Sequence, residues 1–191
     1  MKTKQLPPEQ QLDLIESTIT KSRENLSHYS FDFVFWGWLI LITATLNFIG
    51  LFFTPLEQDS YFIWAISPLL GGIYIANYHW KKDTQKERKT YLEFFLQQLW
   101  IVLGVVMILF PFLLFFDEIN PMVFFPILAG TGTLVSGLVL RFKPLIFGGT
   151  LLLLFPFILQ IVPSFWNMPF YGLVVFIAFA LPGYALKKNT P

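Results

Sequence analysis

The residues of this chain best suited to chemistry are two histidines and two carboxylates. Asp32 follows His28 by four residues, and Glu93 follows His79 later in the chain. Imidazole and carboxylate groups can hold a transition metal, and paired histidines can ligate a haem. The sequence has no cysteine, however, and neither an HxxxH nor an HxxEH spacing. We therefore expect no metal and no cofactor.

The sequence also lacks the motifs of common enzyme classes. It contains no Ser/His/Asp arrangement, no GxGxxG and no Walker loop. An enzyme consequently ranks third among the candidate functions, because the chain supplies no catalytic group to assign.

Two amide side chains, Asn47 and Gln97, stand out because they lie in apolar segments. An amide surrounded by hydrocarbon requires a hydrogen-bond partner. Such side chains usually bond across helices, at about 0.6 kcal/mol each, and we favour this interpretation. The alternative is that Asn47 and Gln97 line a polar cavity for a small neutral solute.

These residues are carried by six apolar stretches, and each is close to the roughly 20 residues that cross a bilayer. None of the six contains Asp, Glu, Lys, Arg or His. Backbone polar groups in lipid must be satisfied internally, so stretches of this length should be helices. The predicted fold class is an all-α integral membrane protein with six transmembrane helices, arranged as three hairpins and preceded by a cytoplasmic amphipathic helix. The predicted spans are residues 33–53, 61–77, 94–116, 121–140, 145–162 and 169–186.

The last two stretches are shorter and contain Pro156 and Pro182, which could kink them or make them re-entrant. In terms of domains, residues 1–30 form a cytoplasmic segment, 31–188 the membrane domain and 189–191 a cytoplasmic tail.

All 13 Lys and Arg residues fall before the first stretch, between the second and third, between the fourth and fifth, or after the last. Short positive loops stay on the cytoplasmic side, so both termini should be cytoplasmic. The chain is 55% hydrophobic with a net charge of +1, which argues against a nucleic-acid partner. Compact loops and the lack of a visible signal peptide suggest a multi-pass protein of a bacterial inner membrane.

The fourth stretch is rich in small residues that recur at helical spacing. Such a face lets helix backbones approach closely. We expect it to pack on neighbouring spans of the same chain, with homodimerisation as a secondary interpretation. The predicted packing residues are Ala129, Gly132, Thr133, Ser136 and Gly137.

The N-terminal segment carries one apolar helical stripe after Pro7-Pro8, consisting of Leu12, Ile15, Ile19 and Leu26. A helix that lies on lipid normally has a Lys/Arg-rich polar face and aromatic residues on the other, and this one has neither. We therefore expect the stripe to dock on protein, either on the chain itself, on a second copy or on a cytoplasmic partner. Packing on the lipid surface is the alternative.

Taken together, these features favour a non-catalytic membrane protein that presents a cytoplasmic helix and loop to a protein partner, as a regulatory or interaction subunit. The alternative is a small transporter or channel for a neutral or lipid-like solute. The two differ in what they require of the bundle: a transporter needs a water-accessible polar cavity, whereas an interaction subunit needs an exposed apolar stripe.

Overall fold

The computed structural model describes residues 7, 9–17, 30–82, 91–114 and 121–188. Within these ranges the regular structure is helical and no strand occurs, so the fold is all-α, as the sequence predicts. A short helix covers residues 9–17. Six long helices and two short 3-10 helices follow: α2 (Ser30–Phe53), η1 (Glu57–Phe62), α3 (Ile63–Lys82), α4 (Tyr91–Leu114), α5 (Pro121–Val139), α6 (Lys143–Leu159), η2 (Ser164–Trp166) and α7 (Asn167–Lys188).

Each apolar stretch of the sequence coincides with one long helix. The shorter fifth and sixth stretches are continuous helices as well, since α6 runs through Pro156 and α7 through Pro182. Both prolines are buried. Because proline has no N–H group, the backbone carbonyl four residues before each ring loses its usual helical hydrogen bond inside the protein.

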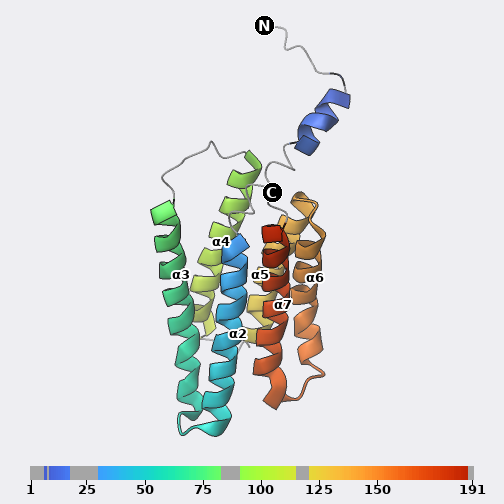
Figure 1. Ribbon diagram of the computed structural model, residues 1–191. Helices are drawn as coiled ribbons and strands as arrows, with labels where there is room; N and C mark the ends of the chain where they lie inside the picture. Colours follow the sequence, from blue (N-terminus) through green and yellow to red (C-terminus); the bar gives the residue numbers. More distant parts are fainter. Residues whose placement is uncertain (1–6, 8, 18–29, 83–90, 115–120, 189–191) are drawn as a thin grey trace.

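The six helices stand side by side and alternate in direction (Figure 1). The starts of α2, α4 and α6 and the ends of α3, α5 and α7 therefore lie at one end of the bundle. α2 packs mainly on α7, α7 on α6 and α6 on α5, while α3 is attached to α2 and α4 to α5. The helix of residues 9–17 lies beyond the same end as the start of α2 (Figure 1).

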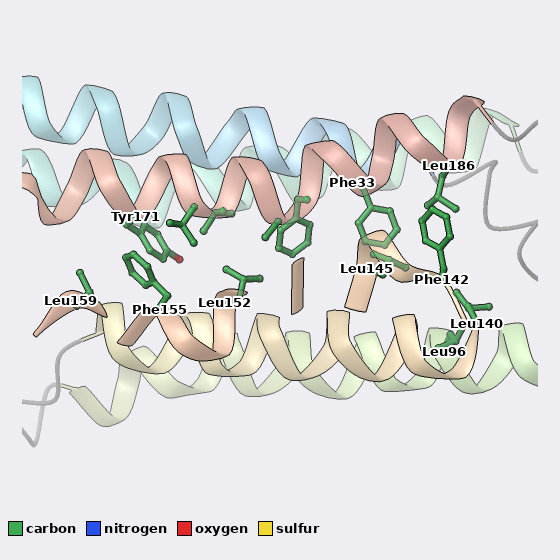
Figure 2. Packing of buried hydrophobic residues seen from close by; sticks show 14 residues of the cluster. Phe33, Leu96, Leu140, Phe142, Leu145, Leu152, Phe155, Leu159, Tyr171 and Leu186 are labelled. Atoms are coloured by element: carbon green, nitrogen blue, oxygen red, sulfur yellow. The ribbon is translucent and has the colours of Figure 1, made fainter. Parts of the chain in front are cut away.

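The core lies mainly between α6 and α7 (Figure 2). On α6 the buried side chains recur every three or four residues, as at Leu152, Phe155 and Leu159, which puts them on one face of the helix. α7 buries the opposing face, where Phe155 of α6 meets Tyr171 with ring centroids 5.6 Å apart.

Small residues allow the backbones in this core to approach closely. A Cβ atom on Gly148 of α6 would collide with the backbone of Ala178 on α7. On the other side of α7, a Cβ on Gly172 would lie 2.7 Å from the Cβ of Ala44 on α2. Such distances are too short for real Cβ atoms, so larger residues would push these helices apart.

Two helices in the described part of the chain, α2 and α7, are long and apolar enough to cross a membrane by length and composition. Shorter apolar lengths occur at Phe94–Leu109, Val123–Val139 and Lys143–Leu159. The most apolar 18-residue window of α7 is 56% buried within the bundle, whereas that of α2 is only 28% buried. α2 thus leaves more of its apolar surface outside the packed interior than α7 does.

Candidate functional site

A buried polar group lies where α2, η1, α3 and α7 meet, at the end of the bundle where α2 ends and α7 begins. Asn47 of α2 is completely buried, and its Nδ2 donates a hydrogen bond to the Ser60 hydroxyl of η1 at 2.9 Å. The Oδ1 atom of Asn47 is also buried and accepts no hydrogen bond. One half of this amide is therefore satisfied and the other is not.

Two further buried polar atoms in the same region lack a hydrogen-bond partner, Nε1 of Trp64 on α3 and Oδ1 of Asn167 on α7. Trp64 packs on Tyr171 of α7 with ring centroids 5.7 Å apart, and Asn167 is one turn before Tyr171. We refer to Asn47, Ser60, Trp64 and Asn167 as the polar cluster. All four side chains are uncharged, so the cluster has the chemistry of a hydrogen-bonding site for a neutral molecule.

A second polar contact holds α3 on α2 further along the bundle. The hydroxyls of Thr43 and Ser67 are 2.6 Å apart, and Thr43 also donates to the carbonyl of Leu39 at 2.8 Å. The first bond joins two side chains and the second joins a side chain to the backbone of its own helix, so the hydroxyl groups find partners within the protein.

The structure does not bring Asn47 and Gln97 together. Asn47 lies in the last two turns of α2, whereas Gln97 is in the second turn of α4. Because α2 and α4 run in the same direction, the two residues are at opposite ends of the bundle (Figure 1). Asn47 is buried and Gln97 is exposed. The polar cavity suggested for this pair is not assembled by these two residues.

The small residues of α5 face two neighbours. A Cβ on Gly137 would lie 2.6 Å from the backbone nitrogen of Ile146 on α6. A Cβ on Gly132 would lie 2.6 Å from the Cδ1 of Leu103 on α4. Thr133 and Ser136 are buried, and Ala129 packs against the core. Ser136 also accepts a hydrogen bond from Nε1 of Trp100 on α4 at 3.2 Å.

The stripe predicted for the N-terminal segment is described in part. Leu12 and Ile15 lie on the helix of residues 9–17 and are 66% and 54% exposed. Ile19 and Leu26 fall outside the described residues. The described part of this helix also carries Glu9, Asp13 and Glu16 but no Lys or Arg, so its charge is negative.

Of the four residues that the sequence suggests as metal ligands, only Asp32 has a described side chain. His28 lies outside the described residues, and the side chains of His79 and Glu93 are not described. Asp32, in the first turn of α2, is partly buried. Among the residues that the structure describes, no group of three or more His, Cys, Asp or Glu side chains could hold a metal ion.

Charge is divided between the two ends of the bundle. Among the described residues, those that carry positive charge in or next to the long helices gather at the end where α2, α4 and α6 begin, and we refer to this as the basic end. They are Lys81, Lys82, Arg141, Lys143, Lys187 and Lys188. At the opposite end the described charged residues are Glu57 and Asp59 of η1.

The sequence points to Asn47 but not to its neighbours. Ser60 and Asn167 lie in segments that are predicted to be loops, where polar residues are ordinary, and Trp64 resembles any aromatic residue near the end of an apolar stretch. The turn through η1 brings Ser60 to Asn47, the packing of α7 on α2 brings Asn167 to the same end of the bundle, and no local pattern encodes either arrangement. In comparisons with protein-family models, with curated proteins and with solved structures, the chain matches none of them.

Proposed function

We propose that the chain is an integral membrane protein whose six long helices cross the bilayer, and that it acts as a non-catalytic interaction subunit. In this proposal the basic end faces the cytoplasm, and the helix of residues 9–17 is presented there to a protein partner. The outward-facing apolar surface of the bundle is the observation that carries the membrane assignment.

This apolar surface extends over several helices. Ile66, Leu70 and Ile73 of α3 are all more than half exposed, and so are Val102 and Ile108 of α4. In water, exposed side chains of this kind on a monomer are normally scattered singly or form patches of a few hundred Å². A lipid environment accounts for them without a cost, since hydrocarbon tails are as apolar as these side chains.

The two ends of the bundle fit the two faces of a membrane. Lys and Arg at the basic end correspond to the cytoplasmic side by the positive-inside rule. Aromatic residues prefer the interfaces, and exposed aromatic side chains occur at both ends: Trp80 and Tyr91 at the basic end, Tyr61 and Trp166 at the other. α2 has 24 residues and is therefore about 36 Å long, enough to span about 30 Å of hydrocarbon with some tilt.

Cysteine labelling in intact cells tests this topology, because the parent chain contains no cysteine. Single variants Asp59→Cys and Ile161→Cys should react with a membrane-impermeant maleimide, since both residues are exposed at the end opposite the basic end. Lys143→Cys and Lys188→Cys should react only after permeabilisation. If Lys188→Cys is labelled from outside while Lys143→Cys is protected, α6 or α7 does not cross the membrane.

The interaction role is supported by the helix of residues 9–17. An amphipathic helix with apolar residues at i and i+3, such as Leu12 and Ile15, can lay that face into an apolar groove of another protein. Its acidic residues disfavour the anionic inner surface of a membrane, which attracts basic segments. We therefore favour a protein partner over the lipid surface. The transporter alternative has less support, because Asn47 and Gln97 lie at opposite ends of the bundle.

The docking of this helix can be tested with a double substitution, Leu12→Ser and Ile15→Ser. Each aliphatic side chain contributes about 1.5–3 kcal/mol when fully buried, so the double variant should lose the partner. Gln10→Ser is the matched control, since Gln10 is exposed and polar on the same helix.

Limited proteolysis of inside-out vesicles would report release of the helix as new cleavage between Lys4 and Arg23. The control should remain as resistant as the parent. Equal resistance in the double variant and the parent would show that the stripe docks on nothing, while the topology result above would stand independently.

A further inference from the structure

Three buried polar atoms of the polar cluster point to a binding site. Oδ1 of Asn47, Oδ1 of Asn167 and Nε1 of Trp64 belong to α2, α7 and α3, and each lacks a hydrogen-bond partner in the protein. Buried polar atoms are nearly always hydrogen-bonded, to protein or to ordered water. Three such atoms in one region therefore require a common explanation.

The contacts of these side chains link the three residues through shared neighbours. Asn47 bonds Ser60, and Trp64 lies one turn after Ser60. The ring of Trp64 in turn packs on Tyr171, and Asn167 lies one turn before Tyr171 on the same face of α7. The cluster is thus connected from α2 through η1 and α3 to α7.

The register of α2 against α7 sets the levels of the two amides along the bundle. The two helices run in opposite directions, and Ala44 faces Gly172. Asn47 is three residues beyond Ala44 and Asn167 five residues before Gly172, toward the same end of the bundle. At 1.5 Å per residue these offsets are about 4.5 Å and 7.5 Å, so the two amides differ in level by about 3 Å. The ring contact between Phe48 and Trp166, at 6.2 Å, agrees with this register.

The types of the three atoms define what they can bind. Two are carbonyl oxygens, which accept hydrogen bonds, and one is an indole N–H, which only donates. A water molecule can donate two hydrogen bonds and accept from the indole, and buried waters typically make about three hydrogen bonds. We propose that Asn47, Trp64 and Asn167 bind one internal water molecule, which joins α2, α3 and α7 at this end of the bundle.

The change in unfolding temperature on removal of the indole donor tests this proposal, because the bound and the unbound donor predict changes of different sign. If water accepts from Nε1, Trp64→Phe breaks a hydrogen bond and should lower the unfolding temperature in detergent by about 2–4 °C. If Nε1 is buried without any partner, the same change removes an unsatisfied group and should raise the unfolding temperature or leave it unchanged. Trp100→Phe is the matched control, since the Nε1 of Trp100 donates to Ser136 at 3.2 Å. Its unfolding temperature should fall.

A double-variant cycle and infrared spectroscopy separate a shared water from ordinary packing loss. Asn167→Ala combined with Trp64→Phe should lower the unfolding temperature by less than the sum of the single variants, because both remove the same water. The purified parent and Trp100→Phe should also show an O–H stretching band that shifts when H₂¹⁶O is replaced by H₂¹⁸O, and Trp64→Phe should lose that band or move it.

Strict additivity in the cycle together with an unchanged band in Trp64→Phe would overturn the proposal. So would a small organic molecule found bound to the purified parent by native mass spectrometry and not to Trp64→Phe, because the site would then hold a larger neutral ligand in place of water.

Discussion

Replacing Gly137 by alanine should destabilise the bundle more than any comparable change on α5. The added Cβ would lie 2.6 Å from the backbone nitrogen of Ile146 and 2.9 Å from the carbonyl carbon of Leu145. Backbone atoms cannot rotate away as the end of a side chain can. α6 would have to move, although it is joined to α5 by a turn in which the N–H of Phe142 bonds the carbonyl of Gly137 at 2.9 Å.

The expected magnitude is the difference of two effects. Overpacking a well-packed interface costs about 1–3 kcal/mol. Alanine is more favourable than glycine within a helix by about 0.5–1 kcal/mol, which offsets part of that cost. The net loss for Gly137→Ala should be about 1–2 kcal/mol, since the neighbours are backbone atoms. That corresponds to a fall in unfolding temperature of about 2–8 °C.

Two other glycines provide controls. A Cβ on Gly104 of α4 would meet nothing within 4 Å, so Gly104→Ala should stabilise the protein by about 0.5–1 kcal/mol. A Cβ on Gly132 would meet the terminal methyl of Leu103, which can rotate, so Gly132→Ala should fall between the other two. Thermal unfolding of the three variants in one detergent, followed by tryptophan fluorescence, measures the order. If Gly137→Ala is as stable as Gly104→Ala, the close packing of α5 on α6 is refuted.

Arg141→Gly should stabilise the protein by roughly 1–2 kcal/mol, because Arg141 has a φ of 49° and glycine adopts that left-handed conformation freely. Arg141→Ala should not stabilise it, and equal unfolding temperatures for the two variants would contradict this reasoning. Ser136→Ala should cost about 1 kcal/mol in the parent and little in a Trp100→Phe background, and additive losses would refute the bond between them. Tyr184→Phe should cost about 0.5–1.5 kcal/mol, because its hydroxyl accepts from Nε1 of Trp38 at 3.1 Å, and a double-variant cycle with Trp38→Phe checks this pairing.

The helices could be predicted from the sequence because long apolar stretches leave the backbone few alternatives. All six predicted stretches coincide with long helices, and their ends differ by at most a few residues, as in α2, which begins at Ser30 rather than at residue 33. The start of α3 differs from the prediction in the type of helix. Glu57–Phe62 forms a 3-10 helix that precedes α3, and this brings Ser60 beneath Asn47. No periodicity in the sequence indicates that turn.

The pairing of the helices could not be predicted, and the partners of Asn47 depend on it. A helix that is apolar on all sides gives no amphipathic signal to show which face is buried. Asn47 and Gln97 look alike in the sequence, each an amide in an apolar stretch, yet one is fully buried beside Ser60 and the other is exposed near the start of α4. The difference arises because α7, distant in sequence, packs along α2, whereas α4 packs mainly on α5.

Small residues carry the information about pairing that hydrophobicity does not. Gly148 lies against Ala178, Gly172 against Ala44, and Gly183 against Val34, so glycines mark the contacts of α7 with both of its main neighbours. If lipid surrounds the bundle, as proposed, burying apolar area provides little drive for association, and close backbone approach has to supply it through van der Waals contact.

Gly72 of α3 and Gly104 of α4 depart from this rule, since a Cβ on either would meet nothing. These two helices have exposed apolar side chains, such as Leu70 of α3 and Val102 of α4. Each of them is attached to the rest of the bundle mainly through one neighbouring helix. A glycine in an apolar helix thus indicates close packing only when another backbone lies opposite it. On α5, α6 and α7 that condition is met by neighbours within the chain, which is why substitutions there should be costly and those at Gly72 and Gly104 should not.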